Sequence, residues 1–475
     1  PGNSGSATAA TGFNVANSLR FAGAARDTYL TATFGSAPTL ATKNTISLWF
    51  KRSLIDATQQ MYATNNNAAN IILNRSGAST GPTAAFYTNS GQLLGPRLYR
   101  DTSAWMHFVY TFDSTQGTEA NRFKVYINGV EETSFNNTAY PAQEASQLGV
   151  NGQEIQIGTR ANYDRIFDGY MAETAFVDGQ ALDATSFGEF DSDSGIWKPI
   201  DISGLTFGNN GFYLEYKQTG TSANSSGIGA DTSGNDLHFA VNAFTAADQS
   251  TDTCTNNFAT LNPLLYGSNY TWSEGNLQFA QTATNWDTTY SSIGVTSGKW
   301  YMEFKGKVGA YYDVGVTDVI DTTNNLTVNS GCVAFKSNGE FARGGAVGDG
   351  LPSTITNPAS NTYTANDIIG IAIDVDNEAV YFSKNGTYEV NSDPTSGASK
   401  TGATTLPNSN STYFFAFAAY KGSAASGTGQ VNFGGGSVDA ISSGNADADG
   451  YGNFEYAPPS GYFALCTKNL AEYGG

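Results

Sequence analysis

This chain contains the same pattern twice: an alternating segment with Val-Tyr, followed by an Asn-Gly pair that predicts a turn. The first copy is RFKVYINGVEETS at 122–134, and the second is AIDVDNEAVYFSKNGTYEV at 372–390. Successive side chains of a strand point to opposite faces, and Asn-Gly tolerates the positive φ angles of a two-residue hairpin turn. Each copy therefore predicts an antiparallel hairpin, and together they locate two β domains.

The composition favours the same fold class over the whole chain. The 475 residues include 54 Gly, 26 Tyr and 29 Phe, and only 14% of residues are charged. Thr, Tyr and Phe favour pleated, half-buried surfaces, whereas Gly and Asn favour tight turns. An aromatic content of 13% argues against a disordered Ser/Thr/Gly chain. We therefore expect an all-β protein of two antiparallel β-sandwiches joined by a partly structured connector.

Charge and rare residue types exclude several classes of function. The net charge is -19 without a cluster of Lys and Arg, so we expect no binding to nucleic acid. There is no run of about 18 apolar residues, so we expect no membrane insertion. Three Cys and two His, widely spaced, give poor support for a zinc site or a histidine-based triad. The sequence leaves open whether Pro1 is a processed N-terminus.

We expect five parts along the chain, with the bounds of the two sandwiches taken from the family resemblances described below. These are an N-terminal arm at 1–16, a first sandwich at 17–200, a connector with added strands at 201–263, a second sandwich at 264–436, and an extended C-terminal segment at 437–475. The connector is expected to add edge strands to a flanking sandwich, because so short a segment makes a marginal core. The segment after Leu182 predicts a short helix, with Asp183 as its N-cap.

The order of the early strands carries a family resemblance. TISLWFKRS, WMHFVYTFD and FKVYINGVEE are followed by IQIGTR and then by Gly169-Tyr170-Met171-Ala172-Glu173. This set resembles the concanavalin A-like, laminin-G-type jelly roll over roughly residues 17–200. The resemblance implies a lectin-like sandwich.

A second set of motifs lies in residues 264–436. It comprises SGKWYME at 297–303, VGV at 314–316, the segment Asp367–Gly386, and VNFG at 431–434. This set resembles the SPRY domain, a B30.2-like sandwich. The resemblance implies that ligands bind in the loops at the ends of the strands.

The end of the chain, YGNFEYAPPSGYFALCTKNLAEYGG, carries the third resemblance. It is similar to a segment of marine tailed-phage structural proteins that combine a lectin-like and a SPRY-like unit. Tyr462 stands where that pattern has Phe, and Cys466 where it has Asn. The resemblance implies a virion-surface, extracellular protein whose partners are other virion proteins, further copies of itself and a host-surface glycan.

The sequence contains no clear pattern of catalytic residues. Retaining glycosidases need two carboxylates about 5 Å apart, which on a strand requires acids that alternate. The nearest candidates, Glu131, Glu132 and Glu154, do not give that alternation. We therefore expect no enzymatic activity.

Two kinds of binding residue are candidates. Asp164 and Asp168, beside the closing strand of the first sandwich, could hold a structural calcium ion or simply solvate a loop. Exposed aromatic rings stack on sugars. The candidates for ligand binding are Tyr163, Arg165, Trp286, Tyr311 and Tyr312, although one of each adjacent pair could belong to a core.

Three hypotheses follow. The leading one is a non-enzymatic virion structural protein, acting as a capsid decoration, fibre or adhesin subunit that binds host glycan or protein and assembles as a homo-oligomer. The second is an extracellular carbohydrate-active enzyme or its binding module. The third is a purely structural scaffold subunit. The glycan, the stoichiometry and the position on the particle are not encoded in any motif.

Overall fold

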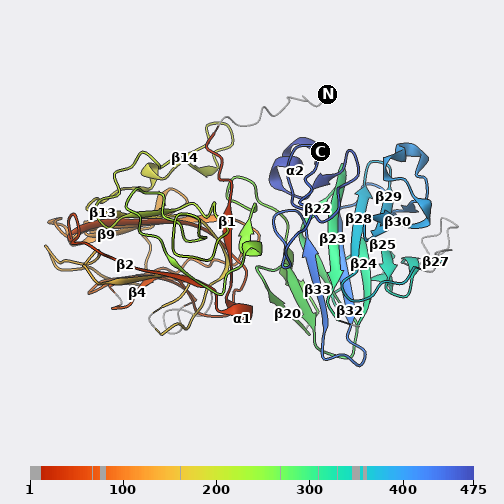
Figure 1. Cartoon of the computed structure of the whole chain (residues 1–475), viewed down its shortest axis with the longest axis horizontal. Helices are drawn as coiled ribbons and strands as arrows, with labels where there is room; N and C mark the ends of the chain where they lie inside the picture. Colours follow the sequence, from red (N-terminus) through yellow and green to blue (C-terminus); the bar gives the residue numbers. More distant parts are fainter. Residues whose placement is uncertain are drawn as a thin grey trace. The chain divides into compact units, whose positions relative to one another are not determined.

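The computed structural model describes residues 12–474, apart from 67, 75–81, 161, 268, 309, 329, 345–353 and 357–360. The chain divides into two compact units, Thr11–Thr255 and Asn256–Gly475. Each unit contains two large sheets whose strands pair antiparallel, with a single parallel pair of named strands in the part described (Figure 1). The predicted all-β class is confirmed. The arm predicted at 1–16 lies mostly outside the described residues.

The first unit contains two sheets of eight strands each. Sheet I has the order β10 (Val130–Glu131), β9 (Phe123–Ile127), β8 (Met106–Asp113), β3 (Lys43–Arg52), β13 (Asp168–Asp178), β1 (Ser18–Ala22) and β18 (Gln249–Ser250), with β16 (Phe212–Leu214) paired to β13. Sheet II has the order β11 (Asn137–Ala139), β7 (Gln92–Leu94), β6 (Ala84–Thr88), β5 (Ala69–Leu73), β4 (Gln59–Thr64), β12 (Glu154–Ile157), β2 (Tyr29–Thr33) and β17 (Ala240–Asn242). The remaining elements are α1 (Gly23–Arg26), η1 (Glu119–Asn121), η2 (Ala184–Ser186), the hairpin of β14 (Gly188–Phe190) and β15 (Trp197–Pro199), and η3 (Ala246–Asp248). The helix predicted after Leu182 is η2, and the Asp183 carboxylate caps it by accepting from the Thr185 N–H at 3.0 Å.

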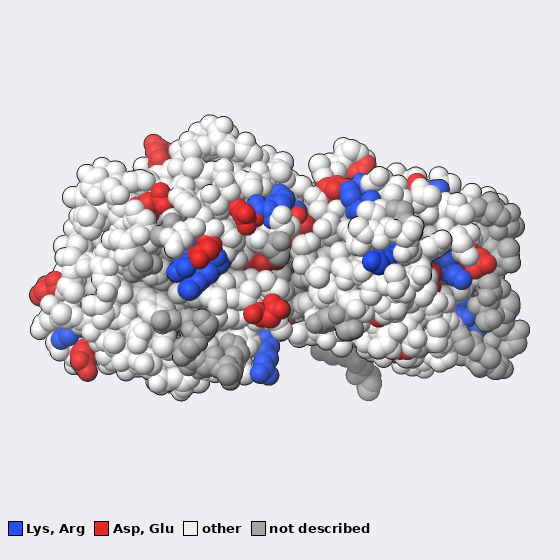
Figure 2. Space-filling model, turned by 90° about the horizontal axis from the view of Figure 1, so that it is seen from below, with Lys and Arg blue, Asp and Glu red and all other residues white. Residues whose placement is uncertain are grey.

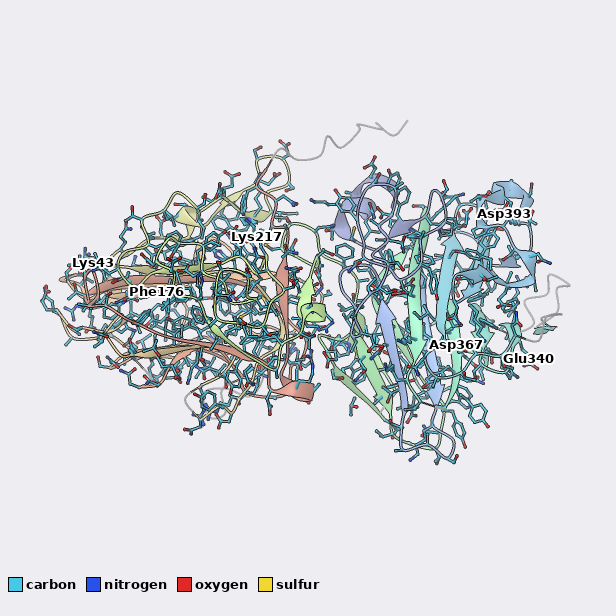
Figure 3. The ribbon with its side chains drawn as sticks, viewed as in Figure 1. Lys43, Phe176, Lys217, Glu340, Asp367 and Asp393 are labelled. Atoms are coloured by element: carbon cyan, nitrogen blue, oxygen red, sulfur yellow. The ribbon has the colours of Figure 1, made fainter. Side chains whose placement is uncertain are left out.

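The first core lies between sheets I and II. Ile46, Leu48 and Phe50 of β3 point into it, as their alternation predicts. Phe176 of β13, labelled in Figure 3, contributes a ring 5.4 Å from that of Phe34.

The outer face of sheet I is also buried. Trp49 and Val109 point away from the first core and pack against a layer that includes Phe187, Trp197 and Tyr213. This layer explains why every residue of β3 except the first is buried.

The connector belongs to the first unit as far as Thr255, and its last residues, 256–263, belong to the second. Its strands β16, β17 and β18 pair with β13, β2 and β1 respectively. Two buried ion pairs fasten it to sheet I: Lys51 Nζ lies 2.6 Å from the Asp252 carboxylate, and Arg20 lies 2.9 Å from Asp248. Added strands were expected here, and the structure assigns them to the sandwich that precedes the connector.

The second unit again contains two sheets. Sheet III has the order β19 (Leu261–Tyr266), β22 (Asp287–Val295), β32 (Tyr413–Tyr420), β24 (Tyr311–Thr317), β25 (Cys332–Lys336), β26 (Glu340–Arg343) and β27 (Thr354–Thr356). Sheet IV has the order β20 (Tyr270–Ser273), β21 (Gln278–Gln281), β33 (Gly427–Asn432), β23 (Lys299–Gly306), β28 (Ile368–Asp374), β29 (Ala379–Lys384) and β30 (Thr387–Tyr388), with β31 (Thr404–Thr405) paired to β29 and β34 (Phe463–Ala464) paired to β23. The helical elements are η4 (Leu326–Val328), η5 (Glu389–Asn391), η6 (Pro394–Ser399) and α2 (Thr467–Tyr473).

The C-terminal segment packs on the outer face of sheet IV. Its strand β34 runs parallel to β23, and the Phe454 ring meets the Tyr301 ring edge-on at 5.1 Å. Tyr462 and Cys466 are buried in the same cluster. The compact second unit therefore extends beyond the predicted range 264–436, because this segment completes its burial.

Both predicted hairpins are present. In the first, Asn128 and Gly129 turn β9 into β10, with φ angles of 47° and 81°. In the second, Asn385 and Gly386 turn β29 into β30, with φ angles of 49° and 79°. Positive φ at both central residues is what an Asn-Gly hairpin turn requires.

Only 14% of the residues are charged. On the face drawn in Figure 2, most Lys and Arg side chains lie beside Asp or Glu. Within the described part of the chain, no helix has the length and apolar character needed to span a bilayer.

Candidate functional site

Three aromatic side chains meet at one end of sheet III. Trp286 immediately precedes β22, Tyr311 is the first residue of β24, and Tyr420 is the last residue of β32. These strands are neighbours in the order β22-β32-β24, and Tyr311 and Tyr420 are direct cross-strand partners. The sheet thus brings together two predicted residues and a third that the sequence analysis did not single out.

The three rings form a continuous row, called here the aromatic row. The Trp286 and Tyr420 rings are stacked, with centroids 5.7 Å apart and planes 25° apart. The Tyr311 and Tyr420 rings are 5.9 Å apart and tilted by 42°. Tyr311 is 56% exposed, and the other two are half-buried. An exposed row of rings on a rigid sheet can stack on the apolar faces of sugar rings.

The structure corrects the prediction for Tyr312. Its side chain is buried in the second core, the hydrophobic cluster formed by residues of sheets III and IV, and its hydroxyl donates to the Thr428 carbonyl oxygen at 2.7 Å. Neighbouring residues of a strand face opposite sides, so the exposure of Tyr311 requires Tyr312 to point inward. A ligand at the surface would therefore contact Tyr311 and not Tyr312.

Planar polar groups lie beside the aromatic row. The carboxylate of Asp287, next to Trp286 in the chain, accepts from the side-chain amides of Asn269 at 2.8 Å and Asn285 at 3.0 Å. Burial raises the pKa of Asp287 above its ordinary value. Asn285 is exposed, and its amide oxygen accepts from the Asn269 amide at 3.5 Å, which leaves a second lone pair for a ligand hydroxyl.

The candidates of the first unit lie in the turn that follows β12. Tyr163 is 46% exposed, and its ring lies 5.0 Å from that of Tyr29 on β2. Both Tyr163 and Arg165 have positive φ angles, of 53° and 54°. The Arg165 carbonyl accepts from the Gln60 N–H at 2.7 Å, which anchors the turn to β4. Tyr163 and Tyr29 are thus a smaller aromatic pair at one end of β2.

The two carboxylates predicted for calcium have different surroundings. Asp164 is exposed and forms an ion pair with Arg160, which lowers the pKa of Asp164. Asp168 is buried as the first residue of β13. Among the residues that the structure describes, no group of three or more His, Cys, Asp and Glu is placed to hold a metal. Calcium at Asp164 and Asp168 therefore stays a prediction.

The acidic residues considered for catalysis each have a separate local partner. Glu131 pairs with Lys124 at 3.2 Å, and Glu132 pairs with Arg97 at 3.2 Å. The Glu154 carboxylate accepts from Gln156 at 2.6 Å. Each of the three carboxylates thus has its own local partner.

Burial raises the pKa of Glu173, Glu303 and Asp313 to about 7, and the sequence analysis considered none of them for catalysis. Glu173 of β13 is buried, and burial raises its pKa to about 7. It has a positive φ of 48° beside the bulge of β13, and it accepts from the Tyr213 hydroxyl. Because Tyr213 belongs to the apolar layer over sheet I, Glu173 lies beneath packed side chains and away from solvent.

Ser47 and His107 form a buried hydrogen bond in the same layer, but its direction is the opposite of the one that serine activation requires. His107 Nδ1 lies 3.0 Å from Trp197 Nε1, which can only donate a hydrogen bond. Nδ1 must therefore accept, so the proton lies on Nε2 and points to Ser47 Oγ at 2.8 Å. Burial lowers the pKa of His107 to about 3. A histidine that donates to the serine cannot take its proton, so this contact is structural.

Comparison with known proteins agrees with the lectin-like sandwich. Residues 24–186 match the family described as the concanavalin A-like lectin/glucanases superfamily, of laminin G type. Over these residues the first unit is similar to the concanavalin A-like family. No curated protein matches the sequence.

Solved structures show weaker likenesses. The SPRY domain of human HERC1 is 15% identical, with a TM-score of 0.28, covering 38% of this chain and 99% of its own. A SAP-like pentraxin from Limulus polyphemus is 16% identical, with a TM-score of 0.28, covering 36% of this chain and 79% of its own. A candidate carbohydrate-binding protein from Bacteroides ovatus is 13% identical, with a TM-score of 0.34, covering 48% of this chain and 59% of its own. At identities this low, the ligand of one protein does not transfer to another.

Proposed function

We propose that this chain is a non-enzymatic carbohydrate-binding protein, and that the aromatic row is its main contact with the ligand. The observation that carries the proposal is the alignment of Trp286, Tyr420 and Tyr311 across three neighbouring strands. The exposed amide of Asn285 supplies a hydrogen-bonding group at one end of the row. The concanavalin A-like match of the first unit supports carbohydrate as the class of ligand.

The biological setting that we propose is the surface of a tailed-phage virion. The support is the resemblance of the C-terminal segment to structural proteins of marine phages, which the sequence carries. The protein would be a decoration, fibre or adhesin subunit. Several copies on one particle would bind the host surface at the same time, so that weak individual sugar sites together give high avidity. Mass spectrometry of purified particles should find this chain, and its absence from the particles would contradict the virion setting without affecting the sugar site.

Absence of catalysis is part of the proposal. The family that matches the first unit includes glucanases, so a hydrolase is the competing function. Against it stand the separate ion pairs of Glu131 and Glu132 and the covered position of Glu173. Glu303, another buried carboxyl with a raised pKa, is held by the backbone N–H groups of Glu455 and Tyr456. Release of reducing ends from any glycan that the protein binds would contradict a non-enzymatic role.

The binding test uses the full chain on a glycan array, followed by titration calorimetry with the best ligand. We expect W286A and Y311A each to weaken binding by about 3- to 10-fold, because each removes one stacking face. F190A is the matched control, because Phe190 is a 52% exposed aromatic residue of the other unit. Equal loss in all three variants, or no glycan bound at all, would contradict the proposed role of the aromatic row.

A further inference from the structure

The second unit contains a cavity of about 270 Å³ over the outer face of sheet IV. Its floor is made by β23, β33 and β28, and its walls by residues 437–442 and 455–456 of the C-terminal segment. The aromatic row lies at an end of sheet III, so the cavity is a separate feature of this unit. Asp367, labelled in Figure 3, lies between two residues that line it, Asn366 and Ile368.

The floor of the cavity is polar because these strands turn their alternate side chains outward there. Glu303 and Lys305 of β23 lie opposite Asn432 and Gln430 of β33 in the sheet register. Their inward neighbours, Phe304 and Val431, belong to the second core. The same alternation that builds the core therefore presents carboxylate, ammonium and amide groups to the cavity.

The charged groups around the cavity already have protein partners. Glu303 accepts from the backbone N–H groups of Tyr456 at 2.7 Å and Glu455 at 3.0 Å. Asp439 accepts from both Lys305 and Lys307 at 2.7 Å. The Glu455 carboxylate accepts from the Ser442 N–H at 2.8 Å. A charged ligand would have to compete with these contacts.

Neutral groups keep the free hydrogen-bonding capacity. The side chain of Asn366 makes no hydrogen bond to another described residue, and Gln430 uses only its amide nitrogen, which donates to Gln278 at 3.0 Å. Amide groups both donate to and accept from hydroxyl groups. The half-buried Tyr456 ring forms part of the wall and adds an apolar surface.

We infer that this cavity binds one neutral sugar ring, such as the terminal hexose of a glycan. A volume of about 270 Å³ lies at the lower end of ligand pockets, which suits a single ring and not a chain of sugars. Amides, partnered charges and one aromatic wall fit a neutral ligand with many hydroxyl groups. The inference rests on the proposed carbohydrate-binding function, to which it adds a second site and a ligand class.

The test titrates the full chain with glucose, galactose, mannose, N-acetylglucosamine and glucuronic acid, with saturation-transfer NMR as the readout. A440W should abolish binding of the neutral sugar, because Ala440 is exposed and lines the cavity, so that Trp fills it. N366G should weaken binding by about 3- to 10-fold, because it removes the amide and tolerates the φ of 71°. N391G, at an exposed Asn with a φ of 54° that does not line the cavity, should bind as the native chain does. Thermal unfolding midpoints check that each variant is folded.

The outcomes separate this site from the aromatic row. Binding of one neutral sugar that A440W abolishes and W286A spares would support the cavity. Binding that W286A abolishes and A440W spares would overturn the cavity and leave the proposed function standing. Equal binding of glucuronic acid, or no monosaccharide binding in a chain that still binds a glycan through the aromatic row, would also overturn the inference.

Discussion

The ring of Tyr456 lies against Gly386, the glycine of the second Asn-Gly turn, so closely that a Cβ on this glycine would overlap the ring. The first Asn-Gly turn has the same arrangement, because a Cβ on Gly129 would overlap the ring of Trp197. Each glycine is therefore required by a positive φ and also by a ring that packs on it. The repeated motif thus forms a hairpin, and its glycine provides a packing surface for an aromatic side chain from later in the chain.

Replacing Gly386 by Ala should lower the free energy of unfolding more than the same replacement at a glycine that has a similar positive φ but no ring packed on it. Gly461 is the matched control, since it has a φ of 81° and no atom lies within 4 Å of the position that a Cβ would occupy. We expect G461A to cost about 1 kcal/mol from backbone strain, and G386A to cost roughly 1–3 kcal/mol more from overpacking. Urea unfolding of both variants measures the difference, and equal costs would show that the Tyr456 ring moves away freely.

Neutralising Asp252 should destabilise the first unit strongly. Asp252 and Lys51 are both buried, 2.6 Å apart, and the Trp105 indole N–H donates to the second Asp252 oxygen at 3.0 Å. D252N leaves the Lys51 charge buried without its partner, so we expect a loss of about 3–5 kcal/mol. D164N, which breaks the exposed pair with Arg160, should cost less than about 1 kcal/mol. Similar losses in denaturant unfolding would contradict the importance of burial.

His107 should remain neutral across the physiological pH range. Its folded pKa is about 3 because of burial, and its proton is fixed on Nε2. Long-range ¹H–¹⁵N NMR should show this tautomer unchanged from pH 5 to pH 8. In urea the same ring should titrate near pH 6.5, which serves as the control. Titration of His107 in the folded chain would refute the assigned hydrogen-bond directions.

Glu303 should make the folded chain less stable as the pH rises, whereas an ordinary ion-paired carboxylate makes it less stable as the pH falls. Burial raises its pKa from 4.5 to about 7, so the folded chain holds a proton that the unfolded chain releases. This contribution is fully present below pH 4.5 and is lost as the pH rises through 7. The size of the loss should be roughly 1–3 kcal/mol.

The measurement compares E303Q with the native chain by urea unfolding between pH 4.5 and pH 8. Gln does not titrate, so the free energy of unfolding of E303Q should fall less over this interval. Glu173 and Asp313, whose pKa values burial also raises to about 7, remain in both chains and cancel in the comparison. Identical pH slopes would show that Glu303 titrates at its ordinary value.

Alternating side chains and Asn-Gly pairs in the sequence predicted the strands and turns more completely than they predicted the aromatic row. Alternation at Ile46, Leu48 and Phe50 identified a core strand, and both Asn-Gly turns were predicted correctly. Trp286 was a candidate as an aromatic residue expected in a loop, and Tyr311 because it was expected just before a strand. Tyr420 was missed because it ends the run TYFFAFAAY, which is typical of a buried strand. Only the order β22-β32-β24 places its ring between the other two, and that order depends on pairing between distant strands.

The cavity was beyond prediction for a related reason. Glu303 and Gln430 follow the period of two, which indicates an outward side chain without saying what covers it. The cover comes from residues 437–442 and 455–456, whose position depends on β34 pairing with β23. Calcium at Asp164 and Asp168 remains a sequence-based prediction.

The strands β17 and β18 have a consequence for how the first unit avoids misassembly. They occupy the outermost positions next to β2 in sheet II and next to β1 in sheet I. A chain shortened to the lectin-like range 17–200 would lack both and would expose two unpaired strand edges. Such edges recruit strands of other molecules and lead to aggregation. A shortened first unit that resists aggregation therefore has to continue through Ser250, well past the match that ends at residue 186.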